Sequence, residues 1–249
     1  DDPHVVEPFI LVDTRTWRAT RVDILAQSVP EALELPDPYP ALITLGMAGP
    51  DTVLIDLEAA GTLSVTGPDV VATAVLRALA CEVVTSPLAL QASPLLLDEL
   101  ADLVAATDPL IVPRLAAGQL GLIATQTARG ITAALQTVGA PDTLSARARG
   151  VGDQCWAPTV LLGASPPGAV APWSGLVAVT TSDQGSWRLS VDDDHHGHLA
   201  PLGIDLDVQH LGADAYTQVL AAMAGGLTEL EREDPVPPTV EDQIGAVAA

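Results

Sequence analysis

Short apolar runs alternate with helix-like patterns along most of this chain. Residues 41–45 and 52–57 are apolar segments on either side of a turn with glycine and proline, which predicts two paired strands. Residues 62–66 form another strand-like run. Residues 70–84 place apolar side chains three and four positions apart and contain no glycine or proline, which predicts a helix. A strand, a tight glycine turn and a helix therefore follow one another from residue 62 to residue 84.

The second half of the chain continues this alternation. The wholly apolar segments 159–162 and 176–180 are typical of strands buried on both faces of a sheet. Residues 187–191 and 198–202 flank a turn of Asp, His and Gly, which predicts a hairpin, and residues 214–224 predict a helix. We also expect a strand over 88–97 and helices over 98–106, 113–119 and 127–137. This order favours a three-layer α/β fold with a mainly parallel sheet.

Three regions differ in composition. Residues 1–37 contain strand-like runs at 9–12 and 16–22, which predict a small β-rich N-terminal extension. Residues 38–228 hold the predicted α/β domain. Residues 229–249 are acidic and contain prolines, so we expect a linker or tail. Because the chain begins at Asp1 rather than at a methionine, we expect it to be a piece of a longer protein.

The charge of the chain narrows the classes of partner. Asp and Glu total 32 against 10 basic residues, all of them arginine, and the net charge is -22. Such a surface repels phosphate backbones and anionic lipids, so we expect no nucleic-acid partner and no direct membrane contact. The sequence has no signal peptide and no apolar run long enough to span a bilayer, which favours a cytoplasmic location. With 48% hydrophobic residues, the chain has enough apolar surface for a core.

The strand, turn and helix over 62–84 stand where a P-loop protein binds phosphate. A P-loop requires two glycines, a lysine and a hydroxyl residue at fixed spacing. Here only Gly67 matches, Thr73 occupies the lysine position, and Asp69 adds a negative charge where phosphates would lie. The strand over 159–162 is followed by Gly-Ala-Ser rather than by the carboxylates that would hold Mg²⁺. We therefore expect no bound cofactor.

One polar cluster has the composition of a metal site. Three aspartates at 192–194 precede His195, His196 and His198, and imidazole and carboxylate groups are ligands for zinc or nickel. The same residues are equally typical of a solvated hairpin turn. Both interpretations stay open at the level of sequence.

Several segments together resemble a known group of proteins. They are 38–46, 53–61, 63–67, 156–162, 187–191 and 201–204. These resemble a central region of large actinobacterial proteins that also carry transmembrane segments, a LysM module and a helical repeat domain of the bacterial transcriptional activator type. The resemblance runs over roughly residues 38–225. It implies that the chain is the cytoplasmic part of a membrane-anchored protein.

That region in turn resembles a degenerate FtsK/SpoIIIE-type, RecA-like ATPase module. In active relatives a strand rich in Asp and Leu precedes the phosphate loop, as Asp56-Leu57 does here. The resemblance implies a RecA/FtsK-like fold that has lost a functional P-loop.

These observations lead to a first functional hypothesis and two alternatives. We expect a non-catalytic pseudo-ATPase module rather than an enzyme, because no catalytic motif is intact. It would serve as a protein-interaction and regulatory scaffold, with a protein or another domain of the same chain as its partner. The first alternative is a nucleotide hydrolase completed by a neighbouring subunit or partner. The second is a metal-responsive binding domain that uses the histidines at 195–198.

Overall fold

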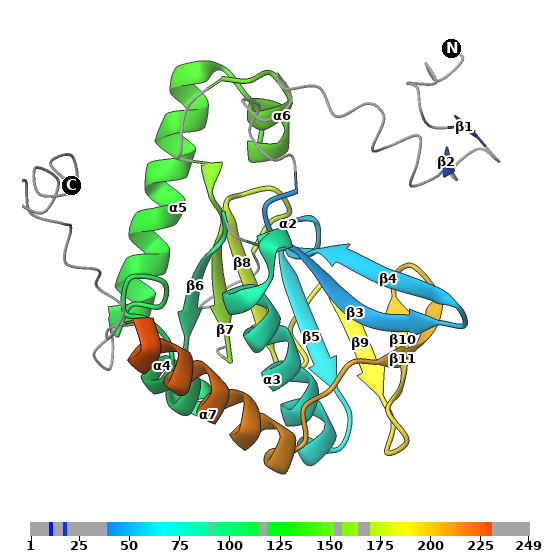
Figure 1. Cartoon of the computed structure of the whole chain (residues 1–249). Helices are drawn as coiled ribbons and strands as arrows, with labels where there is room; N and C mark the ends of the chain where they lie inside the picture. The colour runs from blue at the N-terminus through cyan, green and yellow to red at the C-terminus, as the bar shows by residue number, and fades with distance from the viewer. Residues whose placement is uncertain are drawn as a thin grey trace, which may run out of the picture.

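A computed structural model of the chain describes most of its central part (Figure 1). The described residues are 10–11, 17–18, 39–89, 91–114, 119–151, 156–163 and 170–230. The extension predicted over 1–37 is described only as β1 (Ile10–Leu11) paired antiparallel with β2 (Trp17–Arg18). The tail predicted over 229–249 lies almost wholly outside the described residues. The three predicted regions therefore stay predictions.

A single nine-stranded sheet organises the described residues, in the order β4-β3-β11-β10-β9-β5-β8-β7-β6. Its strands are β3 (Leu42–Ala48), β4 (Asp51–Asp56), β5 (Thr62–Thr66), β6 (Ser93–Leu96), β7 (Thr159–Leu162), β8 (Leu176–Thr180), β9 (Trp187–Val191), β10 (His196–Ala200) and β11 (Ile204–Val208). The helices are α2 (Leu57–Ala60), α3 (Asp69–Thr85), α4 (Ala101–Ala106), α5 (Gln119–Val138), α6 (Thr143–Ala148) and α7 (Ala213–Leu230), with short 3₁₀ turns at Pro87–Ala89 and Asp98–Leu100.

The sheet has two halves. Strands β6, β7, β8, β5 and β9 are all parallel, and we call them the parallel half. Strands β10, β11, β3 and β4 continue from β9 with antiparallel pairing, and we call them the antiparallel wing. The α/β fold with parallel strands in its core is thus confirmed. The sequence did not predict the size of the wing.

Helices cover both faces of the parallel half (Figure 1). On one face, Val160 and Val177 belong to the main hydrophobic core together with apolar residues of α3. On the other face, Leu161 and Ala178 pack with Ala124 of α5. Because neighbouring residues of a strand point to opposite faces, wholly apolar strands such as β7 are what two covered faces require. The three layers follow from this alternation.

Helix α7 returns to α3 after the last strand. Among the described side chains of α7, only Tyr216 is buried. The guanidinium carbon of Arg77, on α3, lies 4.8 Å from the centroid of the Tyr216 ring, within the range of a cation–π contact. No helix in the described part of the chain has both the length and the apolar character needed to cross a bilayer.

A buried ion pair joins the segments at the amino ends of the parallel strands. Arg147 of α6 pairs with Glu58 of α2, and both side chains are almost completely buried. The backbone N–H of Gly175 donates to Glu58 Oε1 at 2.8 Å, and Thr143 donates to the same carboxylate. Arg147 Nη1 also donates to the Trp156 carbonyl at 2.7 Å. The Glu58 charge is therefore satisfied by partners far away in sequence.

The turn between β5 and α3 packs tightly on β9. Gly67 has φ 149°, and a Cβ built on it would lie 2.2 Å from the Val191 carbonyl oxygen. A side chain at this position would collide with backbone, which cannot easily move. Glycine is therefore required here by close packing as well as by its conformation.

Three predicted elements differ from the observed ones. The helix predicted over 127–137 is part of a longer helix, α5, which begins at Gln119. Of the helix predicted over 113–119, residues 115–118 lie outside the described residues, and residues 113 and 114 are not helical. The helix predicted over 214–224 extends through two glycines to Leu230. The predicted hairpin is present, but its second strand is β10, and the sequence interpretation missed β11.

We expect Arg147→Met to lower the free energy of unfolding by about 3–5 kcal/mol, because it leaves the Glu58 carboxylate buried without its counter-charge. Arg188→Met is the matched control, since Arg188 forms an ion pair with Asp183 at the surface. That change should cost less than about 1 kcal/mol. Urea unfolding monitored by circular dichroism measures both. Similar losses in the two variants would contradict the role assigned to the buried pair.

We expect Gly67→Ala to destabilise the fold by about 1–3 kcal/mol, because the new methyl group meets the Val191 carbonyl and the backbone angle is unfavourable. Gly121→Ala, in α5, has nothing within 4 Å of its new Cβ. This control should be stabilised by up to about 1 kcal/mol through helix propensity. Thermal unfolding separates the two effects, and an unchanged Gly67→Ala variant would refute the close packing.

Candidate functional site

Ligands of open α/β sheets bind at the carboxyl ends of the strands, which makes the end of β5 the first place to examine. β5 ends at Thr66 and α3 begins at Asp69, so only two residues connect them. One of the two is Pro68, which has no N–H to donate. The N–H groups of Val71 and Ala72 both bond to the Pro68 carbonyl at 2.9 Å. Few backbone donors are left here for a phosphate.

The candidate nucleotide residues at this turn do not form a cradle. Gly67 lies against Val191 of β9 rather than opening a loop. Asp69 is exposed in the first turn of α3, and Thr73 is half-buried one turn further along. A P-loop instead curls several successive N–H groups around the phosphates. The segment has the geometry of an ordinary βα turn.

The other residues considered for nucleotide chemistry lie elsewhere. β7 ends at Leu162 and is followed by Gly163, while residues 164 and 165 are outside the described residues. Asp56 caps α2 near the amino end of β5, where its Oδ1 accepts the Glu58 N–H at 2.7 Å. Burial is the main cause that raises the pKa of Asp56 to about 6. Asp56 therefore acts as a helix cap.

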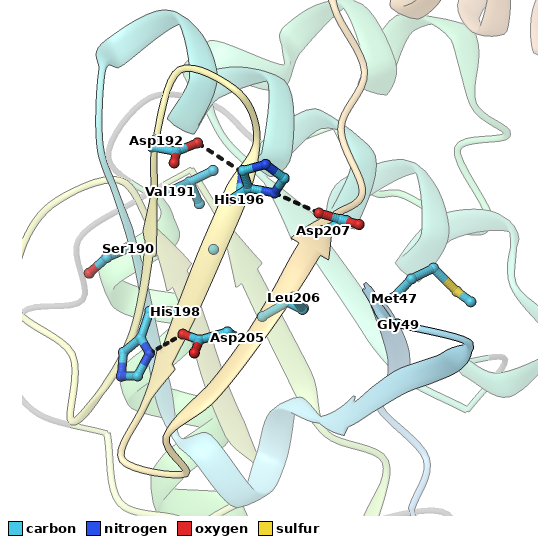
Figure 2. A pocket seen from close by; sticks show the side chains of 11 residues that line it. Met47, Gly49, Ser190, Val191, Asp192, His196, His198, Asp205, Leu206 and Asp207 are labelled. Carbon is cyan, nitrogen blue, oxygen red and sulfur yellow. Dashed lines mark hydrogen bonds and ion pairs between the residues drawn. The ribbon is translucent and has the colours of Figure 1, made fainter.

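A groove of about 580 Å³ lies on the antiparallel wing, on the face away from α3 (Figure 2). We call it the wing groove. The exposed side chains of β10 and β11 in this groove come from alternate residues, because every second side chain of a strand points to the same face. The wing groove is lined by Met47, Gly49, Ser190, Val191, Asp192, His196, Gly197, His198, Asp205, Leu206 and Asp207.

Two His–Asp pairs cross from β10 to β11 in this groove (Figure 2). His196 stands directly opposite Asp207, and His198 stands opposite Asp205. In each pair the imidazole Nδ1 lies 2.6 Å from a carboxylate Oδ1. Gly197, between the two histidines, points to the opposite, buried face. Strand register therefore sets the pairing.

Protonation of His196 is favoured by its surroundings. The hydrogen bond to Asp207, followed by the negative charge of that residue, raises the pKa of His196 above its ordinary value. Because the pKa is higher in the folded state, the pair stabilises the fold at pH values below the ordinary histidine pKa. This contribution is lost as the pH rises through the raised pKa. The groove thus becomes more negative as His196 loses its proton.

The three histidines proposed as metal ligands do not meet at one point. His195 lies in the turn before β10, with φ 64°, and its ring stacks on His210 with centroids 3.5 Å apart. His196 and His198 instead take part in the cross-strand pairs of the wing groove. Among the residues that the structure describes, no three His, Cys, Asp or Glu side chains gather as metal ligands. The geometry gives the predicted metal site no support.

Sequence reasoning missed the partners of these histidines. Asp205 and Asp207 lie in the pattern Ile-Asp-Leu-Asp-Val, whose strict alternation of apolar and acidic residues is a signal for a half-exposed strand. That signal was present and places both carboxylates on one face. The pairing of Glu58 with Arg147, 89 positions apart, has no comparable signal in the sequence.

No protein-family model matches the chain, and no curated protein matches it. Solved structures do share its fold. One is the pCW3 conjugation coupling protein TcpA in its monomer form with ATPγS, with a TM-score of 0.52 and 9% identity over 75% of this chain and 73% of that one. Another is EssC (ATPases 2 and 3) from Geobacillus thermodenitrificans, with a TM-score of 0.55 and 9% identity. It is matched over 82% of this chain and 52% of its own length.

These similarities correct one prediction and support another. The prediction that this chain is not an enzyme is contradicted, because the similar solved structures are ATPase domains. That prediction rested on the missing lysine and the missing Mg²⁺ carboxylates. Their absence does not determine which fold the chain adopts. The predicted RecA/FtsK-like architecture is confirmed at the level of fold. The chain therefore shares an α/β fold with these solved structures.

Proposed function

We propose that this chain is a regulatory and protein-interaction domain with an FtsK-like ATPase fold, acting inside a larger multidomain protein. The observation that carries the proposal is the outer face of the antiparallel wing. The parallel half is covered by helices on both faces, whereas the wing presents a polar groove on one face. Uncovered sheet surface of this kind is suited to binding another polypeptide.

The charge of the chain favours a protein partner. With a net charge of -22 and no lysine, the surface attracts cationic segments and repels nucleic acid. The partner is a separate protein or another domain of the same polypeptide. The resemblance of residues 38–225 to actinobacterial LysM proteins leads us to propose that the parent protein is membrane-anchored, with this domain on the cytoplasmic side.

A second candidate is a nucleotide hydrolase completed in trans. The β5–α3 turn lies at the carboxyl end of β5, and the similar solved structures are TcpA with ATPγS and ATPases 2 and 3 of EssC. Because this chain has no lysine, a neighbouring subunit would have to supply the cation that grips the phosphates. This candidate requires phosphate release from MgATP when neighbouring subunits are added and none from the isolated chain. Equal release in both would eliminate it.

A photo-cross-linking experiment tests the proposed interaction surface. Benzoylphenylalanine replaces Met47 in the wing groove of the full-length parent protein, and a second variant carries it at Leu122 on α5. Both side chains are exposed, so the two probes are equally able to react. We expect cross-links from position 47 to a second polypeptide or to another domain, identified by mass spectrometry. No cross-link at 47, or equal yields at 47 and 122, would refute the proposal.

A further inference from the structure

The wing groove contains three aspartates and, besides its two histidines, no basic side chain. Asp192, Asp205 and Asp207 line it, and neither lysine nor arginine is among its lining residues. The arginine of β9, Arg188, is paired with Asp183 outside the groove. The aspartates of the groove therefore favour a positively charged occupant.

The carboxylates of β11 are available to such an occupant. The side chains of Asp205 and Asp207 are 86% and 70% exposed. Each gives one oxygen to an imidazole nitrogen of β10. A guanidinium offers two parallel N–H donors to a carboxylate and remains charged at every physiological pH. Arginine is therefore able to replace the imidazole as the partner of each aspartate.

The spacing of the carboxylates selects an extended occupant. Asp205 and Asp207 are two residues apart on one strand, as are His196 and His198 on the next. Two residues of a strand span about 6.4–6.8 Å, and the two side chains point to the same face. An extended peptide has the same repeat. Cationic side chains at alternate positions of such a peptide would therefore meet both carboxylates at once.

From this geometry we propose that the wing groove binds an extended segment of a partner protein with arginine at alternate positions. This inference rests on the proposed function, since it names the class of partner for the same surface. It follows from the groove, its charge and the two-residue repeat of Asp205 and Asp207.

Fluorescence anisotropy with a labelled Gly-Arg-Gly-Arg-Gly-Arg-Gly peptide tests the proposal. Its control is Arg-Gly-Gly-Arg-Gly-Gly-Arg, which has the same composition and charge but no two arginines that are two residues apart. We expect the alternating peptide to bind at least about tenfold more tightly, because only its arginines match the strand repeat. Equal affinities for the two peptides would overturn the proposed register.

Variants of the chain provide the second arm of the test. Asp205→Asn combined with Asp207→Asn should weaken binding of the alternating peptide at least about tenfold. Asp193→Asn combined with Asp194→Asn is the matched control, because it removes the same charge from an exposed turn of the same wing that does not line the groove. Equal losses in the two double variants would show non-specific attraction and would overturn the proposal.

The peptide-binding and cross-linking experiments together distinguish a failure of this inference from a failure of the proposed function. If position 47 cross-links to a partner but the alternating peptide does not bind, the domain is an interaction module and the inferred class of segment is wrong. If the peptide binds with the expected specificity but position 47 forms no cross-link, the groove is competent and its use in the parent protein is refuted. Circular dichroism of each variant confirms that the fold is retained.

Discussion

The buried carboxylate of Glu58 joins segments that are far apart in the sequence, at the amino ends of the parallel strands. It belongs to α2, directly before β5, and it is bound by α6 and by the backbone that leads into β8. Through Arg147 the same network reaches the Trp156 carbonyl, close to the start of β7. A buried charge without these partners would cost several kcal/mol, so the arrangement specifies one alignment of the strands.

The amino ends and the carboxyl ends of the parallel strands therefore differ in structure. The amino ends of the parallel strands are held by the Glu58 network, which is buried and rigid. At the carboxyl end of β5, the short turn at Gly67 leaves little room for a ligand. A polar groove lies instead on the antiparallel wing. The fold is similar to that of ATPase structures, yet the exposed His–Asp pairs lie on the antiparallel strands β10 and β11.

Elements built from local patterns were predictable from the sequence. The β5–α3 unit and the buried strands β7 and β8 follow from apolar periodicity and from Gly and Pro at their ends. The helix predicted over 127–137 began too late, because α5 already starts at Gln119 and continues through Gly130. The packing of Ala124 and Ile131 on either side outweighs the cost of about 1 kcal/mol for one glycine.

The candidate site was only partly accessible to sequence reasoning, for a physical reason. The histidines at 195–198 were recognised as a cluster, but proximity in sequence is not proximity of side chains in a strand. Alternation sends Gly197 to the core, leaves His196 and His198 on the outer face, and assigns His195 to the preceding turn. Their true partners, Asp205 and Asp207, depend on strand register, which a single sequence specifies weakly.

Strand β9 belongs to both halves of the sheet. It pairs in parallel with β5 on one side and antiparallel with β10 on the other. Val191, at its end, presents its carbonyl oxygen to Gly67 and also lines the wing groove. The two places thus share one short piece of backbone. If a ligand at one of these places changes the affinity for a ligand at the other, thermodynamic linkage requires the reverse effect to have the same factor, and β9 is the strand that joins the two places.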